Sequence, residues 1–165
     1  MKEIVDIKSL YQYAKNETSE DLENFDLIFY GVTDEEYTFR LEDIVSLCEL
    51  QIQDYPHMEP HQESKIMEMV YYVINEYGVS AGFPELIKGL EKIIEIKGFL
   101  VGMYLRIMFN SYSEEVILQF ANLLINCSSS FKNEIIKLIL ESIDIDSKRY
   151  EIKGNIILEK LEFQR

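Results

Sequence analysis

The chain of 165 residues carries 30 acidic and 16 basic side chains, so its formal net charge at pH 7 is −14. Its apolar content of 47% and its charged content of 28% are those of a globular protein, and they exclude an intrinsically disordered one. A chain of this length can bury a self-sufficient core without disulfides or metals. We expect a single domain over residues 1–165, with a more acidic part at 1–63 and a more regular part at 64–165.

We expect neither a secretory signal nor a membrane span in this chain. Its start carries charges from Lys2 to Lys8, which interrupt any apolar signal region. The longest apolar run, "GFLVGMYLRIMF", contains Arg106 and is shorter than the roughly 18 to 20 residues that a span requires. Cys48 and Cys127 lie far apart on apolar stripes, which favours buried free thiols. We therefore expect a soluble cytoplasmic protein without a disulfide.

The first half of the chain predicts helices of unequal clarity. Residues 2–15 and 19–31 carry apolar stripes typical of helices, although "FDLIFYGV" also fits a short strand, so the first 30 residues stay undecided. A clearer helix is predicted over 34–55, where apolar side chains recur every three or four residues. Thr33 followed by Glu36 fits a capping box at its start.

The second half predicts a regular series of helices. One runs from about His61 to Tyr77 and ends at Gly78, and Pro84 suits the first position of the next. Helix starts are expected near positions 84, 99, 114, 131 and 147. Pairs of such helices form units of about 30 to 33 residues, as in helical repeat proteins. The predicted fold class is all-α, a single domain of stacked antiparallel helices with HEAT- or armadillo-like hairpins in the C-terminal half.

Two short patterns suggest chemistry. The stretch "GVSAG" matches a nucleophile elbow around Ser80, but a helix precedes it and both histidines come earlier in the chain. The stretch "DYPHMEPHQE" contains His57 and His61, yet Pro56 and Pro60 break the helix that would place them on one face. We interpret the first stretch as a turn between helices and the second as a corner. We predict no catalytic residue, no metal ligand and no cofactor.

Acidic side chains are concentrated in the first part of the chain. Residues 1–63 hold 16 acidic and 4 basic residues, whereas residues 64–165 hold 14 and 12. Such a surface steers a basic partner towards the protein, and tyrosines among the charges supply contact area. Mere solubility is the alternative, and the lack of a basic patch argues against nucleic-acid binding. The candidate partner-binding residues are Glu17, Glu20, Asp21, Glu23, Tyr30, Asp34, Glu35, Glu36, Tyr37, Glu42, Asp43, Asp54 and Tyr55.

The stretches "GFPELIKGLEKIIEIKGFLVGMYLRIMFN" and "SYSEEVILQFANLLINCSSSFKNEIIKLILESID" resemble the helical hairpins of HEAT-type proteins. Small acidic helical proteins rich in Ile, Lys, Asn and Tyr also resemble the bacterial immunity proteins of polymorphic-toxin and contact-dependent growth inhibition systems. That resemblance implies a non-enzymatic inhibitor whose acidic face occupies the basic cleft of a cognate toxin domain, often a nuclease. A HEAT-like adaptor with a partly apolar groove in the second half, and a metal-dependent enzyme centred on His57 and His61, remain open.

Overall fold

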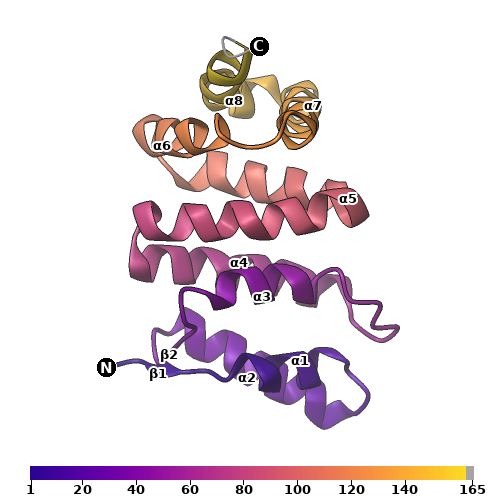
Figure 1. The fold of residues 1–165 in the computed structure, drawn as a ribbon. Helices are drawn as coiled ribbons and strands as arrows, with labels where there is room; N and C mark the ends of the chain where they lie inside the picture. The colour runs from indigo at the N-terminus through magenta and orange to yellow at the C-terminus, as the bar shows by residue number, and fades with distance from the viewer. Residues whose placement is uncertain (163–165) are drawn as a thin grey trace. The chain divides into compact units, whose positions relative to one another are not determined.

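The computed structural model describes residues 1–162 and confirms the all-α fold class. Within these residues the chain forms eight helices and one pair of very short parallel strands (Figure 1). In chain order the elements are β1 (Glu3–Ile4), α1 (Ile7–Ala14), α2 (Ser19–Thr33), β2 (Tyr37–Thr38), α3 (Asp43–Leu50), α4 (Pro60–Tyr77), α5 (Val79–Ser111), α6 (Glu114–Leu124), α7 (Ser129–Ile145) and α8 (Ser147–Glu162). The similarity of the later hairpins to HEAT repeats stays a prediction.

Tertiary contacts divide the chain into two compact units. The first unit ends at Gly89 and the second begins at Leu90, so the long helix α5 contributes its first turns to one unit and the remainder to the other. The predicted division at residue 63 concerns charge, and it lies within the first unit. Each unit has its own fully buried apolar side chains, including Phe25 and Val70 in the first and Tyr104 and Phe120 in the second.

The first unit is built around α2 and α4. Helix α2 contacts α1, α4 and β2, while α4 contacts α3 (Figure 1). The strand pair is closed by two backbone hydrogen bonds, from Glu3 N to Glu36 O at 2.9 Å and from Val5 N to Thr38 O at 2.8 Å. These bonds connect the start of the chain to the segment after α2, so that segment cannot join a helix.

The second unit contains the later part of α5 and helices α6 to α8. Both α6 and α7 pack against α8. Gly154 permits the close approach of α7, because a Cβ atom there would lie 3.0 Å from a methyl carbon of Ile139. Lys153, the preceding residue, donates hydrogen bonds to the carbonyl oxygens of Phe109 and Tyr112 at the end of α5. Neighbouring residues of α8 thus contact two different helices.

The helix predicted over 34–55 is wrong in its extent. Helix α2 continues to Thr33, whose hydroxyl donates to the carbonyl of Tyr30 at 3.0 Å and therefore forms no capping box. Glu35 then adopts a left-handed conformation with φ of 63°, and the chain enters β2. Only Asp43–Leu50 is helical in the region. The parallel pairing with β1, a contact distant in sequence, overrides the local helical pattern.

The helix starts predicted for the second half are largely confirmed. Ser113 and Ser128 cap α6 and α7 by accepting hydrogen bonds from Val116 N and Phe131 N. Gly78, with φ of 87°, separates α4 from α5, but α5 begins at Val79 and Pro84 lies in its second turn. A non-helical residue at 97 divides α5 close to the predicted boundary.

Candidate functional site

The side of α2 that faces away from its neighbours carries an ordered set of acidic and apolar side chains. Glu20, Glu23, Leu27 and Tyr30 follow one another at intervals of three, four and three residues, which places them on one side of the helix. All four are exposed, with 65% of Leu27 and 53% of Tyr30 accessible to solvent. The opposite side of the helix is buried. We call these four residues the α2 outer face.

Tyr30 is held in position although it is exposed. Its ring meets the ring of Phe29 edge to face, with centroids 5.4 Å apart. The ammonium group of Lys65 lies 5.4 Å from the Tyr30 ring centroid and 2.7 Å from a carboxylate oxygen of Asp26. Lys65 thus joins α4 to α2 and restricts the tyrosine ring. Its charge is balanced by Asp26, so the α2 outer face keeps its negative character.

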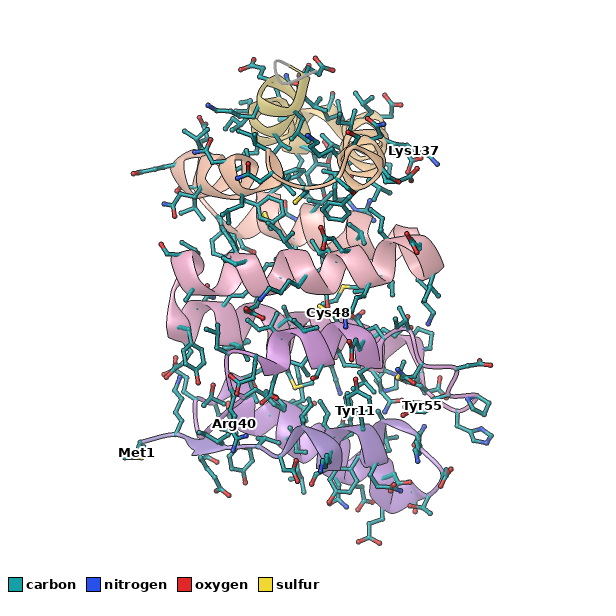
Figure 2. The ribbon with its side chains drawn as sticks, viewed as in Figure 1. Met1, Tyr11, Arg40, Cys48, Tyr55 and Lys137 are labelled. Atoms are coloured by element: carbon teal, nitrogen blue, oxygen red, sulfur yellow. The ribbon has the colours of Figure 1, made fainter. Side chains whose placement is uncertain are left out.

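The structure separates the other predicted contact residues into two groups at opposite ends of α2. At 1.5 Å per residue, its 15 residues span about 22 Å. Glu17 precedes the helix and lines a hollow with Tyr55, and the side-chain amide of Asn16 donates to His57 O at 2.9 Å, which connects the two loops. Figure 2 shows Tyr55 at one end of the unit and Arg40 at the other. Asp54 therefore belongs with Glu17.

The second group follows α2. It comprises three consecutive exposed residues, Asp34, Glu35 and Glu36. The hydrogen bond from Lys2 to Glu76 is the largest cause that raises the pKa of Lys2, and the charge of Glu35 raises it further. Exposed Glu42 lies outside both groups, at the start of α3. A partner that contacted both ends of α2 would also cover the α2 outer face between them.

Two predicted contact residues, Asp21 and Asp43, are buried. Only 9% of Asp21 is exposed, and its carboxylate accepts hydrogen bonds from Glu17 N at 3.0 Å and Thr18 N at 3.1 Å, which closes the capping box of α2. Only 8% of Asp43 is exposed, and its carboxylate accepts from Arg40 N at 2.9 Å. These carboxylates hold the backbone at helix starts, so we remove both from the set of contact charges.

Asp43→Asn is expected to stabilise the folded protein slightly at pH 7 and to leave it unchanged near pH 4. Burial raises the pKa of Asp43 above its ordinary value of 3.8, although the hydrogen bond from Arg40 N opposes the shift. The folded state therefore retains this proton to higher pH than the unfolded state, and the contribution of Asp43 to stability falls as pH rises from about 4.

Asparagine accepts the same backbone hydrogen bond without a charge. Urea unfolding of Asp43→Asn and the unsubstituted protein between pH 4 and pH 7 measures the difference, which should grow with pH. Asp43→Ala is the control, and it should cost about 1 kcal/mol through the lost hydrogen bond from Arg40 N. A difference between Asp43→Asn and the unsubstituted protein that shrinks with pH would contradict the expectation.

The remaining tyrosines are only partly available to a partner. Tyr37 is half-buried because its ring packs against Gly31 of α2, where a Cβ atom would lie 2.1 Å from the ring carbon Cδ2. Tyr55 is also half-buried and lies near Tyr11, whose pKa is raised by burial first and by Glu49 and Tyr55 in addition (Figure 2). Of the three predicted tyrosines, Tyr30 exposes its ring most fully.

The stretches around His57 and Ser80 lie at helix boundaries, as their prolines and glycine suggest. His57 and His61 are exposed, the first in the loop before α4 and the second in the first turn of that helix. Ser80 lies in the first turn of α5. Across residues 1–162, no three His, Cys, Asp or Glu side chains are grouped so that they could hold a metal ion.

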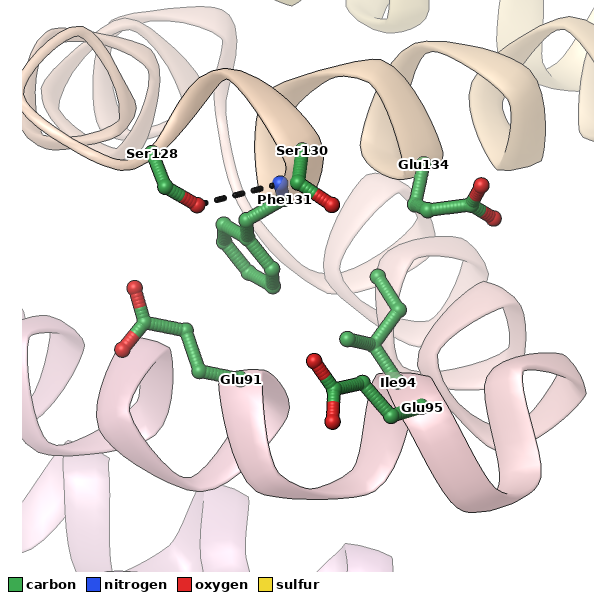
Figure 3. Close-up of a pocket in the computed structure, with 7 residues that line it drawn as sticks. All are labelled: Glu91, Ile94, Glu95, Ser128, Ser130, Phe131 and Glu134. Carbon is green, nitrogen blue, oxygen red and sulfur yellow. Dashed lines mark hydrogen bonds between the residues drawn. The ribbon is translucent and has the colours of Figure 1, made fainter.

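A second candidate site is a groove in the second unit, between residues 91–95 of α5 and the start of α7 (Figure 3). It has a volume of about 670 Å³ and an apolar part formed by Ile94 and Phe131. Its other lining residues are polar or acidic, namely Glu91, Glu95, Glu134, Ser128 and Ser130. Cys127 lies nearby, and its pKa is raised by burial and by Glu91, which makes its thiol a poor nucleophile at neutral pH.

Comparisons with known proteins return no matching family model, no similar curated protein and no similar solved structure. In the part of the chain that the structure describes, none of the helices combines the length and the apolar character that crossing a membrane requires. The assignment of a function therefore depends on the α2 outer face, the acidic groups beside it and the groove.

Sequence reasoning missed Leu27. The apolar stripe predicted for residues 19–31 contains Leu22, Phe25, Ile28 and Phe29, and these positions form the inward side of α2. Leu27 lies off that stripe, and it is three residues before Tyr30 and four after Glu23. This spacing was the signal that could have identified an apolar side chain on the acidic side of the helix.

Proposed function

We propose that this protein is a bacterial immunity protein, which acts in the cytoplasm and neutralises a cognate toxin by binding its basic domain. The observation that carries the proposal is the exposed acidic surface of the first unit, with Leu27 and Tyr30 among its charges. Between residues 17 and 63 the chain has 14 carboxylates and Arg40 as its one basic residue. That excess is large even after the buried carboxylates of Asp21 and Asp43 are set aside.

Inhibition by such a surface needs no chemical step. A nuclease binds the phosphates of its substrate with a basic cleft, and a rigid acidic surface that fits the cleft competes for the same cationic side chains. Long-range attraction raises the rate at which the two proteins meet, while apolar contacts slow their separation. The toxin is then occupied before it reaches nucleic acid.

The proposal predicts that protection depends on the charges of the first unit. We expect the product of the neighbouring gene to carry the toxin domain. Co-expression with that domain should allow growth, whereas the domain alone should arrest it. A variant that combines Glu17→Gln, Glu20→Gln, Glu23→Gln and Glu36→Gln should lower the association rate constant at least 10-fold at low salt. Stopped-flow measurements with the purified domain provide that constant.

The matched control removes the same number of exposed carboxylates from the second unit, through Glu114→Gln, Glu141→Gln, Glu151→Gln and Glu159→Gln. It should retain nearly the unsubstituted rate. For the unsubstituted protein, raising the salt concentration should slow association steeply, because exposed charges are screened. Absence of a complex with the toxin domain, or an association rate indifferent to salt, would refute the proposal.

The groove of the second unit favours a second candidate function, that of a protein-binding adaptor. Its apolar part at Ile94 and Phe131 and its carboxylates could receive a segment of another protein (Figure 3). The two functions differ in their response to charge reversal. Replacement of Glu17, Glu20, Glu23 and Glu36 by lysine should abolish toxin binding, whereas it should leave binding at the groove intact.

A further inference from the structure

We infer that the α2 outer face is the central docking surface of this protein, and that its occupant is a basic protein surface with an apolar pocket beside two or more cationic side chains. The inference rests on the proposed function and specifies the partner's chemistry. Among the acidic parts of the first unit, this face combines carboxylates with two exposed apolar side chains. Energetically important contacts are usually apolar or aromatic and surrounded by polar groups.

The order of side chains along α2 gives the face a direction. Glu20 and Glu23 come first, and Leu27 and Tyr30 follow within the next two turns. Tyr30 comes ten positions after Glu20, which corresponds to about 15 Å along the helix. The complementary surface therefore carries its cationic groups at one end and its apolar pocket at the other. A partner with the reverse order would place its apolar pocket opposite Glu20 and Glu23.

Leu27 contributes little to folding. The core side of α2 is formed by Phe25, Ile28, Phe29 and Val32, and the buried fraction of Leu27 is small by comparison. Single exposed apolar residues are common on protein surfaces. Leu27, however, lies one helical turn from Tyr30, so the two side chains form a continuous patch beside the carboxylates.

Tyr30 also meets the requirement that a good anchor lose little freedom on binding. Its ring is already restricted by the edge contact with Phe29 and by the Lys65 ammonium, which Asp26 holds at 2.7 Å. A side chain that is ordered before binding costs less conformational entropy when the complex forms. Tyr30 is therefore suited to enter a pocket of the partner with its ring in the present orientation.

The negative charge of the α2 outer face determines which kind of partner can bind it. A second copy of this chain would bring two acidic surfaces together, and like charges at an interface are unfavourable. Nucleic acid is excluded for the same reason, since its phosphates are also negative. A basic protein surface is attracted by Glu20 and Glu23 and buries Leu27 and Tyr30 in its own apolar pocket. Charge complementarity therefore identifies the occupant.

The test measures binding of the purified toxin domain from the neighbouring gene to single variants of the full chain. Leu27→Ala and Tyr30→Ala should each weaken affinity by about 30-fold, mainly through faster dissociation. Glu20→Gln combined with Glu23→Gln should mainly slow association and reduce its dependence on salt. Surface plasmon resonance at two salt concentrations separates the two rates, and thermal unfolding checks that every variant is folded.

The matched control for Leu27→Ala is Ile152→Ala on α8, because both side chains are 65% exposed. Glu151→Gln combined with Glu159→Gln on the same helix is the control for the glutamate pair. Neither control should alter affinity. If the unsubstituted chain binds the domain while the α2 variants bind equally well, the inference fails and the proposed function stands.

If the unsubstituted chain does not bind the domain at all, the proposed function fails and the inference fails with it. A dimer of the protein alone that dissociates on Leu27→Ala would show that a second copy occupies the face, and it would also overturn the inference. Sedimentation velocity of the isolated protein detects this outcome before any partner is added.

Discussion

Gly31→Ala is expected to destabilise the folded protein by about 1 to 3 kcal/mol, the usual cost of overpacking. The Cβ atom of an alanine at this position would lie 2.1 Å from Cδ2 and 2.5 Å from Cε2 of the Tyr37 ring. No pair of non-bonded carbon atoms tolerates such a separation, so either α2 or the segment carrying Tyr37 has to move. The strand pairing Glu3 with Tyr37 restrains that movement.

Gly31→Ala should stabilise the protein, instead of destabilising it, when the Tyr37 ring is absent. In a Tyr37→Ala background, the three ring carbons nearest to the added Cβ atom are absent, and the alanine at position 31 contributes its higher helix propensity, which is worth up to about 1 kcal/mol relative to glycine. The double-mutant cycle should therefore give a coupling energy of about 1 to 4 kcal/mol. Chemical unfolding monitored by circular dichroism of the four proteins measures this coupling.

Gly98→Ala is the matched control, because a Cβ atom at that position has no heavy atom within 4 Å. It should leave stability unchanged or increase it slightly. Equal effects of Gly31→Ala with and without the Tyr37 ring would show that the contact is not what limits position 31. The result also concerns function, because it would identify Tyr37 as a packing residue and leave Tyr30 as the anchor to test.

Lys153→Met is expected to destabilise the protein by about 2 to 3 kcal/mol. The ammonium group of Lys153 donates to the carbonyl of Phe109 at 2.6 Å and to that of Tyr112. These carbonyls lie at the C-terminal end of α5, where backbone acceptors lack helical partners and the helix dipole favours positive charge. Methionine retains most of the side-chain volume but leaves the carbonyls without this donor.

The control for Lys153→Met is Lys137→Met on α7, which removes an exposed lysine (Figure 2). Its cost should be within about 0.5 kcal/mol of zero, as for most surface substitutions. Hydrogen exchange of the last turn of α5 should accelerate in Lys153→Met and remain unchanged in Lys137→Met. A loss of stability equal in the two variants would contradict the capping role of Lys153.

Gly31→Ala tests a contact in the first unit, and Lys153→Met tests one in the second. Neither substitution changes a residue of the α2 outer face. Leu27→Ala and Tyr30→Ala alter side chains that are mostly exposed. Their effects on binding can therefore be measured in a folded protein. Asp21 and Asp43 are unsuitable for such measurements, because their carboxylates hold helix starts.

Features that depend on neighbours in sequence were predictable. Ser113 and Ser128 cap helices because a hydroxyl can reach the backbone N–H three residues later, and Gly78 separates α4 from α5 because glycine tolerates positive φ. The all-α class followed from the apolar periodicity of the later segments. The excess of acidic residues before position 64 required only counting.

Features that depend on contacts between distant residues were settled by the tertiary structure. Tyr37 and Thr38 leave their helical pattern because β1, more than 30 residues earlier, offers backbone hydrogen bonds to the same segment. Identifying the residues that a partner can contact also required the tertiary structure. Asp21 and Glu20 count equally in the composition, but the fold buries Asp21 and exposes Glu20. The fold also leaves Leu27 beside Tyr30 on the acidic side of α2. The sequence by itself determined the local elements and the charge of this protein, whereas the packing of those elements decided which charges a partner can reach.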